Sequence, residues 1–347
     1  MTLKKFKAAA VQAAPIFLDA GATTEKACAL SREAARAGAE LIVFPEVFIA
    51  GYPYWSWYLS PLDASPWFPR LQQSAVRVPG PEIDRLCQVA TELGVYIVIG
   101  VNESVASSLG TVFNTNLLIG PEGLIARHRK LVPTFAEKLT WASGDGSSLR
   151  VHETTLGPLG MLACGENTNT LARYTLLAQG ELIHIANYIA FPFISNYDMP
   201  EAIRIRAGAH SFEGKIFTIV ACSAMSDEIL KVLDPTPDHK KQLTGTPNAF
   251  SGIYGPDGRL VSDPIIDREG IVYADIDLNR CIEPKQYHDI QGHYNRFDIF
   301  KLEVNREPLA PITFRNSNSR TEQLTAAEDT PDEIEQGISS FVRLPNN

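Results

Sequence analysis

Short runs of apolar, often β-branched residues alternate along the chain with stretches of helical periodicity. The clearest runs lie at 41–44, 95–101, 161–163 and 217–222, and residues 23–39 read as an amphipathic helix stopped by Gly38. Residues 8–18 read as a buried first strand followed by a turn. Continuous apolar strands flanked by helices indicate a sheet that is covered by helices. The pattern therefore predicts an α/β protein.

Several of these strands are followed directly by a polar residue. Glu46 comes after the run at 41–44, and Cys164 comes after the run at 161–163. In α/β folds the loops at the carboxyl ends of strands collect functional groups. We therefore expect Glu46 and Cys164 to converge on one edge.

An aromatic segment, residues 52–68, departs from this regular pattern. It contains seven aromatic residues and three prolines, which makes a long helix across it improbable. We predict an irregular apolar loop that walls a pocket or is buried against a partner subunit, because monomers seldom expose so much aromatic surface. Packing of this loop on its own domain is the alternative.

Charge, length and motifs exclude several classes of function. The net charge is −9, and residues 317–336 hold six acidic residues and one basic residue, so the body of the chain has no basic stripe for nucleic acid. No apolar stretch is long enough for a membrane span. We find no phosphate-binding, dinucleotide, zinc-peptidase or serine-hydrolase motif.

The cysteines and histidines indicate neither disulfides nor a metal. Five cysteines are widely spaced without a C-x-x-C pair, and seven histidines are scattered, with His288 and His293 the nearest pair. The weak apolar run near the N-terminus reads as a strand rather than a signal peptide. We therefore expect a cytoplasmic protein that needs no metal or organic cofactor.

Three polar residues are the candidates for chemistry. A strand-to-helix turn at Cys164 would expose a thiol whose pKa is lowered by backbone N–H groups. Glu46 could serve as a general base, and Lys130, where a strand runs into a proline turn, could stabilise a developing anion. Taken one at a time, each also reads as an ordinary residue: a core cysteine, a paired carboxylate and a solvated lysine.

Their combination is more specific. The strings LIVFPEVFIAGYPYW, RHRKLVPTFAEKLTW and GMLACGENTNTLARY occur in this order, and DIQGHYNRFDIF follows downstream. These motifs closely resemble the signature regions of the nitrilase superfamily, specifically its true nitrilase branch, and the resemblance covers about residues 5–305.

The resemblance implies a catalytic triad of Glu46, Lys130 and Cys164, with Glu137 in a supporting role. It also implies a four-layer αββα sandwich and a homodimer that extends into larger, spiral assemblies. One departure is Gly165, because many nitrilases have tryptophan immediately after the nucleophile, so we expect extra space there. We expect a single hydrolase domain over residues 1–310 and a polar, acidic extension over residues 311–347.

The expected reaction is hydrolysis of an organic nitrile to a carboxylic acid and ammonia. Cys164 attacks the nitrile carbon, and the thioimidate is converted to a thioester that a second water cleaves. Substrate-binding positions are expected after strands and in the aromatic segment: Tyr52, Tyr54, Trp57, Gly165, Asn187 and Tyr188.

Two other functions remain open at this stage. An amidase of the same superfamily would use the same groups on a carboxamide, although the downstream GHY segment and the aromatic GYPYW string favour nitriles. A non-catalytic assembly protein on this fold is the other, but a silent scaffold has no need for costly buried charges at four positions.

Overall fold

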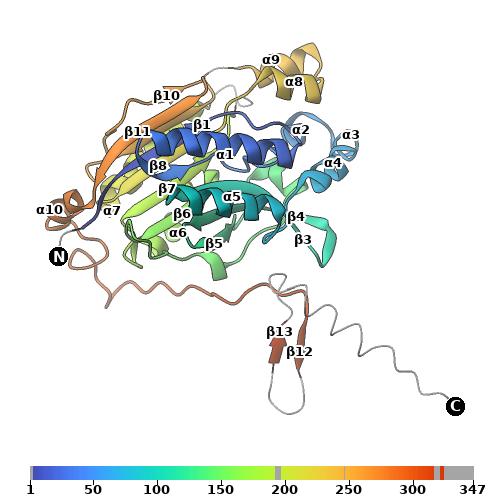
Figure 1. The fold of residues 1–347 in the computed structure, drawn as a ribbon. Helices are drawn as coiled ribbons and strands as arrows, with labels where there is room; N and C mark the ends of the chain where they lie inside the picture. Colours follow the sequence, from blue (N-terminus) through green and yellow to red (C-terminus); the bar gives the residue numbers. More distant parts are fainter. Residues whose placement is uncertain (1–2, 192–196, 246, 316–320, 324–347) are drawn as a thin grey trace.

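Two β-sheets lie face to face at the centre of the computed structural model (Figure 1), which describes residues 3–191, 197–245, 247–315 and 321–323. Helices cover the outer face of each sheet. The arrangement is a four-layer α/β sandwich, as predicted.

The first sheet has the order β11-β1-β2-β3-β4-β5. Its strands β1, β2 and β3 are parallel, and the outer strands β11, β4 and β5 run antiparallel to their neighbours. The strands are β1 (Lys5–Gln12), β2 (Ala39–Val43), β3 (Tyr96–Val105), β4 (Ser108–Gly120), β5 (Gly123–Arg129) and β11 (Gly270–Asp277).

The second sheet has the order β10-β9-β8-β7-β6. Its strands β6, β7 and β8 are parallel, so their carboxyl ends lie at one edge. The strands are β6 (Leu159–Ala163), β7 (Ile183–Tyr188), β8 (Phe217–Cys222), β9 (Phe250–Tyr254) and β10 (Ile265–Ile266).

The apolar core fills the space between the sheets. Leu41 and Val98 of the first sheet share one cluster of buried side chains with Met161 and Ile219 of the second. The outer faces pack on helices, α1 (Ala20–Arg36) and α5 (Pro81–Leu93) on one side, α6 (Thr170–Leu177) and α7 (Met199–Gly214) on the other. Strands buried on both faces explain why the predicted runs are continuously apolar.

Local capping decides where the first helix begins. The Asp19 carboxylate accepts a hydrogen bond from the Ala22 backbone N–H at 2.9 Å, and Gly38 leaves the helix with a φ of 90°. An aspartate at this position satisfies a backbone donor that would otherwise lack a partner. The helix therefore begins and ends slightly earlier than the predicted 23–39.

The prediction of an irregular loop at 52–68 was wrong. The segment contains α2 (Trp55–Tyr58), α3 (Pro61–Ala64) and the start of α4 (Trp67–Ser74). The prolines rule out one long helix but are tolerated in the first turn of a short one, as at Pro61. Trp55 is buried and stacks on Trp67, with ring centroids 5.1 Å apart.

The remaining elements lie mostly at the periphery. Among the described helices, none is long and apolar enough to cross a membrane. Most of the predicted extension, 316–320 and 324–347, lies outside the described residues. The other elements are η1 (Phe135–Leu139), η2 (Gly146–Ser148), η3 (Cys164–Thr168), α8 (Asp227–Leu233), α9 (Pro237–Leu243), η4 (Leu278–Cys281), α10 (Ile282–Lys285), β12 (Thr313–Arg315) and β13 (Thr321–Gln323).

Candidate active site

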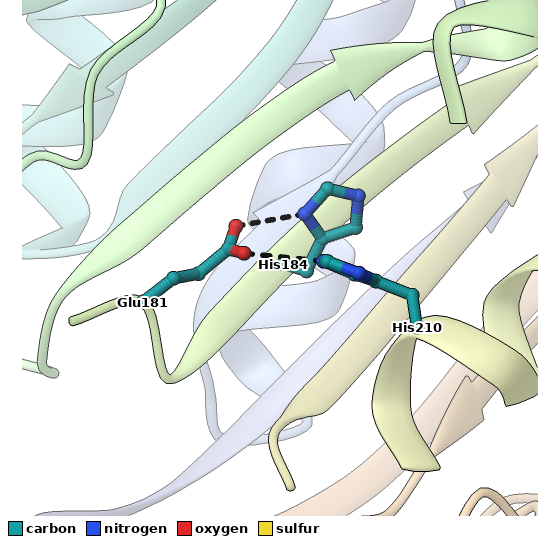
Figure 2. Close-up of side chains that lie close together, drawn as sticks. All are labelled: Glu181, His184 and His210. Atoms are coloured by element: carbon teal, nitrogen blue, oxygen red, sulfur yellow. Dashed lines mark hydrogen bonds and ion pairs between the residues drawn. The ribbon is translucent and has the colours of Figure 1, made fainter. Parts of the chain in front are cut away.

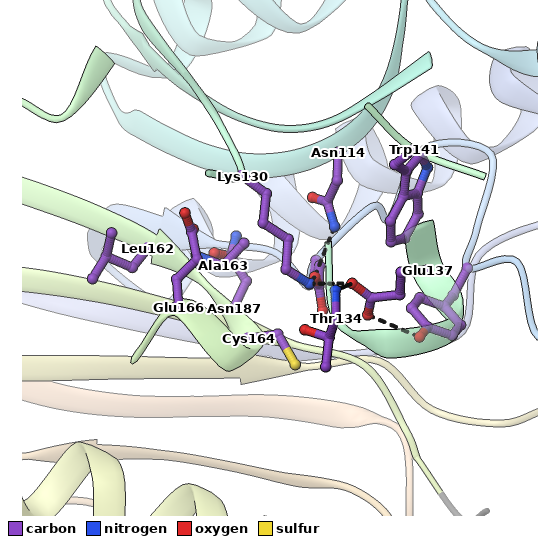
Figure 3. A network of polar contacts seen from close by, with 12 residues as sticks. Asn114, Lys130, Thr134, Glu137, Trp141, Leu162, Ala163, Cys164, Glu166 and Asn187 are labelled. Atoms are coloured by element: carbon purple, nitrogen blue, oxygen red, sulfur yellow. Dashed lines mark hydrogen bonds and ion pairs between the residues drawn. The ribbon is translucent and has the colours of Figure 1, made fainter. Parts of the chain in front are cut away.

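The candidate residues follow strands of both sheets and meet at one edge of the sandwich (Figure 3). Glu46 lies shortly after β2. Lys130 lies directly after β5, and Cys164 lies directly after β6. The Glu46 backbone N–H donates to the carbonyl oxygen of Tyr188, the last residue of β7, at 3.3 Å. The two sheets are thus tied together where the polar side chains emerge, and the predicted convergence of Glu46 and Cys164 is observed.

Glu46 owes its position to a close approach between backbones. A Cβ placed on Gly100 of β3 would lie 2.2 Å from the Val47 nitrogen. Only glycine allows the segment after β2 to cross β3 at this distance. Two backbone hydrogen bonds, from Gly100 N–H to the Pro45 carbonyl and from Phe44 N–H to the Val98 carbonyl, hold the crossing.

Lys130 lies between two carboxylates in the interior. Its Nζ donates to Glu46 Oε1 at 2.8 Å and to Glu137 Oε2 at 2.7 Å, and all three side chains are buried. Burial alone lowers the pKa of Lys130, but the carboxylates of Glu137 and Glu46 outweigh it and hold that pKa well above its ordinary value. Lys130 is therefore a permanent cation at this point.

The two oxygens of Glu46 have different surroundings. Oε1 accepts from Lys130 and from Asn114 Nδ2, the latter at 2.7 Å. Oε2 has no hydrogen-bond partner among the described residues. Burial raises the pKa of the Glu46 carboxyl, and Glu137 adds to the rise while Lys130 opposes it. A buried carboxylate with one free oxygen and a raised pKa suits proton transfer.

Glu137 is, by contrast, held at both oxygens. Oε1 accepts from the Tyr52 hydroxyl at 2.9 Å, and Oε2 accepts from the Thr134 backbone N–H at 2.6 Å as well as from Lys130. Trp57 Nε1 donates in turn to the Tyr52 hydroxyl at 2.7 Å. The structure brings all four residues of the expected site together, with Glu137 in the position of a support for Lys130.

Cys164 occupies a strained turn. Its φ is 46°, in the left-handed region that non-glycine residues rarely adopt. Burial, followed by the charge of Glu46, raises the pKa of the thiol well above its ordinary value. The expectation that the turn lowers this pKa was wrong, because burial and a nearby carboxylate outweigh the short helical turn that begins at Cys164.

A cavity of about 610 Å³ opens beside Cys164. Tyr52, Trp57 and Gly165 line it, as expected for substrate-binding positions. Sequence reasoning missed most of the other wall, which comes from segments with no recognisable motif, apart from Thr134 and Phe135 beside the lysine motif. The expected site residues Glu137 and Cys164 also line the cavity. The further lining residues are Thr134, Phe135, Ile189, Phe191, Tyr197, Met199, Arg206 and Gln242.

Three expected wall residues, Tyr54, Asn187 and Tyr188, do not line this cavity. Asn187 joins the sheets instead, since its Oδ1 accepts from Asn116 at 2.7 Å and its Nδ2 donates to the Phe44 carbonyl at 3.2 Å. Tyr54 and Tyr188 are buried in the core. Their places after strands were correct, but the direction of each side chain is decided by packing.

Gly165 provides less free space than expected. A Cβ at this position would meet Thr134 Oγ1 at 2.9 Å, so the threonine hydroxyl already occupies that direction. The cavity extends elsewhere, past aromatic rings. Trp57 packs against Phe191 and Phe135, with ring centroids 4.6 and 5.6 Å apart.

Two features lie away from this cavity. A larger cavity of about 850 Å³ lies between α6 and residues 295–306 and contains none of the four candidate residues. The histidines are also less scattered than the sequence indicates. Glu181, His184 and His210 form a buried group whose donor atoms lie within 4.8 Å of one another, a spacing that could hold a metal ion.

Comparison with known proteins agrees with this geometry. The sequence profile described as "Carbon-nitrogen hydrolase" matches residues 7–286. The chain belongs to the carbon–nitrogen hydrolase family. It is 36% identical to an aliphatic nitrilase of Rhodococcus rhodochrous over 88% of this chain and 84% of that protein. It is 33% identical to a cyanide hydratase of Alternaria brassicicola, over 94% and 92%.

Solved structures show the same fold. The carbon-nitrogen hydrolase from Helicobacter pylori G27 matches with a TM-score of 0.65 and 19% identity, over 85% of this chain and 97% of that one. At this identity the likeness concerns the fold alone.

Proposed function

We propose that this family member is a nitrilase, which hydrolyses an organic nitrile to the carboxylic acid and ammonia. One observation carries the proposal: a thiol and a carboxylate with one free oxygen, Cys164 and Glu46, accompany a fixed lysine cation beside a largely apolar cavity. The nitrilases at about one-third identity over most of both chains support nitriles as the substrate class.

The first half of the reaction forms a carbon–sulfur bond. Because burial keeps Cys164 protonated at rest, Glu46 Oε2 accepts the thiol proton as sulfur attacks the nitrile carbon. The nitrogen gains this proton, which gives a thioimidate. Lys130 faces the developing negative charge, and its two carboxylate partners fix its ammonium group.

The second half releases both products. Water adds to the thioimidate to form a tetrahedral adduct, and loss of ammonia from it leaves a thioester. Glu46 then takes a proton from a second water, which cleaves the thioester to the acid and restores the Cys164 thiol. These steps use only the side chains described and water.

The cavity wall supports aromatic or long-chain nitriles. Trp57, Phe135 and Phe191 supply apolar surface, and a volume of about 610 Å³ exceeds the need of the smallest nitriles. A linear nitrile leaves no amide NH₂ group to be placed, and a mispaired polar group costs about 1–3 kcal/mol, roughly 5- to 150-fold in rate.

A panel that pairs each nitrile with its own amide tests this proposal. We expect acid and ammonia to form faster from the nitrile in each pair, and aromatic or long-chain nitriles to react at least as fast as the smallest. Faster turnover of amides throughout would favour an amidase. Accumulation of the amide as the main product from nitriles would indicate a hydratase instead.

We further propose that the protein forms homodimers or larger, spiral assemblies. Leu171 on α6 and Ile205 and Phe212 on α7 are exposed apolar side chains on the outer layer of the second sheet. Such a surface favours association. Light scattering that finds only a 38.1 kDa monomer over a range of concentrations would refute this.

The thiols support an intracellular setting. All five cysteines are free, as is usual where the compartment is reducing. We therefore retain the cytoplasm as the proposed location.

A further inference from the structure

The buried group of Glu181, His184 and His210 lies where β6, β7 and α7 meet, away from the cavity (Figure 2). Glu181 Oε1 is 2.7 Å from His184 Nδ1, and Oε2 is 3.1 Å from His210 Nε2. A Cβ on Gly160 of β6 would lie 2.0 Å from Glu181 Oε1. The strand thus carries a glycine where the carboxylate needs room.

A line of hydrogen bonds runs from this group to the candidate nucleophile. His184 Nε2 is 2.8 Å from Asn167 Oδ1. Asn167 Nδ2 donates to the backbone carbonyls of Cys164, at 3.0 Å, and of Leu162, at 3.3 Å. The side chain of Asn167 is buried, so water does not compete for these bonds.

Donor and acceptor counting places two protons on His184. The NH₂ group of Asn167 faces two carbonyl oxygens, so its Oδ1 is an acceptor and His184 Nε2 must donate to it. The lowered pKa of Glu181 keeps its carboxyl ionised and therefore an acceptor, so His184 Nδ1 donates to it as well. His184 is therefore an imidazolium, balanced by Glu181.

The protonation of the two neighbours agrees with this count. Burial by itself raises the pKa of the Glu181 carboxyl, but the charge and hydrogen bonds of His184 and His210 outweigh it and lower that pKa. Burial, aided by His184, lowers the pKa of His210 to about 4. A neutral His210 donates its Nε2 proton to Glu181, and the group as a whole is uncharged.

The hydrogen bonds that start at Glu181 end at the strained turn of Cys164. Cys164 has a φ of 46°, and such a conformation persists only where surrounding contacts hold it. Asn167 holds the turn from one side. Glu166 holds it from the other, because its Oε2 accepts from the Ala163 N–H at 2.8 Å while His128 fixes the same carboxylate at 3.1 Å.

We propose that Glu181, His184 and Asn167 form a positioning chain for Cys164, in which a doubly protonated His184 orients the asparagine that holds the Cys164 carbonyl. Its link to turnover rests on the proposed function. A divalent metal between the histidines is the competing interpretation. A metal there would have to displace the protons on His184 Nδ1 and His210 Nε2 and would leave net positive charge in a closed interior.

Matched substitutions of the two histidines test the proposal. His184→Phe removes the chain, whereas His210→Phe removes an equally buried ring but leaves Glu181, His184 and Asn167 connected. We expect kcat to fall roughly 10- to 100-fold in His184→Phe with KM within about twofold, and to fall less than about threefold in His210→Phe. Equal losses in both variants would show a merely structural group and overturn the proposal.

A conservative variant guards against misfolding. His184→Gln keeps an N–H donor toward Asn167, so we expect it to recover much of the kcat lost in His184→Phe. Asn167→Asp cannot donate to the Cys164 carbonyl and therefore shows the kcat of an enzyme without the positioning chain. If His184→Phe does not fold, His184→Gln is compared with Asn167→Asp instead. Equally low kcat values in these two variants would contradict the positioning chain.

A second measurement separates this proposal from the nitrilase assignment. Alkylation of Cys164 by iodoacetamide, followed by peptide mass spectrometry, reports on the thiol without any nitrile. We expect slower or less selective alkylation in His184→Phe than in His210→Phe, even if the wild type turned over no nitrile. Stoichiometric zinc in protein purified from zinc-supplemented medium, lost in both variants, would support the metal interpretation instead.

Discussion

Two of the buried ionic groups in the described part of the chain differ in what their atoms face. Glu46, Lys130 and Glu137 are at most 2% exposed and lie beside the cavity, where Glu46 Oε2 has no partner among the described residues. In the other group the Glu181 carboxylate is paired at both oxygens, and none of its members lines the cavity.

The two groups also differ in net charge, and this difference decides which of them can accept a proton. Two carboxylates around one lysine leave a negative charge, so the first group can accept a proton from Cys164. One carboxylate between a charged and a neutral histidine leaves the second group without net charge. Unsatisfied buried charge is costly and is retained where chemistry needs it, whereas a satisfied group contributes rigidity.

The largest expected effect is the loss of the nucleophile. Cys164→Ala should abolish turnover with little change in stability, because the exchange is small for small. Intact-mass analysis after a nitrile soak should show an adduct on the wild type and none on the variant. Cys222→Ala, a matched exchange at the buried end of β8, should keep its activity. Substantial turnover by Cys164→Ala would remove Cys164 from the site.

Next in size is the general base. Glu46→Gln keeps its shape but cannot accept a proton, so kcat should fall at least about 10²-fold. Lys130→Ala should be similarly damaging. Glu103→Gln is the control, since Glu103 is equally buried but paired with Arg127 and Arg129. Its folded fraction should turn over normally. If Glu46→Gln keeps a rate near that of the wild type, the general base must be another residue, and Glu137 is the next candidate.

The raised pKa of Glu46 predicts the acidic limb of the pH profile. Burial raises this pKa, and the reaction needs the ionised carboxylate. The midpoint of the rise in kcat/KM should therefore lie at a higher pH than the pKa of an ordinary carboxyl group. In Glu46→Gln the residual activity should lack this limb. An unchanged limb in the variant would assign it to a different group.

A smaller loss of kcat is expected when the hydrogen bond from Tyr52 to Glu137 is removed. Tyr52→Phe removes the hydroxyl that donates to Glu137, which should lower kcat about 10-fold, as for one hydrogen bond to a charged group. Tyr54→Phe removes a hydroxyl that is buried away from the cavity and should cost less than about threefold. Steady-state kinetics on both variants measures the two values of kcat. Equal losses would contradict the assignment of Tyr52, rather than Tyr54, to the cavity wall.

The smallest effect concerns acid stability. Burial raises the pKa of the Glu166 carboxyl, but His128 outweighs it, so the folded pKa lies below the ordinary 4.5. The stability that ionised Glu166 contributes is therefore present above 4.5 and is lost as the pH falls through the folded pKa. Urea midpoints across this range should decline less steeply in Glu166→Gln, and equal slopes would exclude this linkage.

Local sequence patterns determined the layers and pointed to the candidate site residues. β8 has the predicted bounds 217–222, because a strand buried on both faces is largely apolar. Cys164 and Glu46 were found from their places after such strands, and three ordered motifs made Lys130 and Glu137 specific. The domain boundary at 310 stays a prediction.

Tertiary packing alone decided the rest. Tyr52 and Tyr54 are only two positions apart, and the local backbone conformation decides which of them faces the cavity. That proline-rich segment has no regular periodicity from which the direction of either side chain could be predicted. His184 and His210 lie on different elements and become neighbours only when α7 packs on the second sheet. The Cys164 thiol has a raised pKa because folding removes water and brings Glu46 close. Burial and proximity arise from long-range contacts, and the sequence of a single segment carries no record of them.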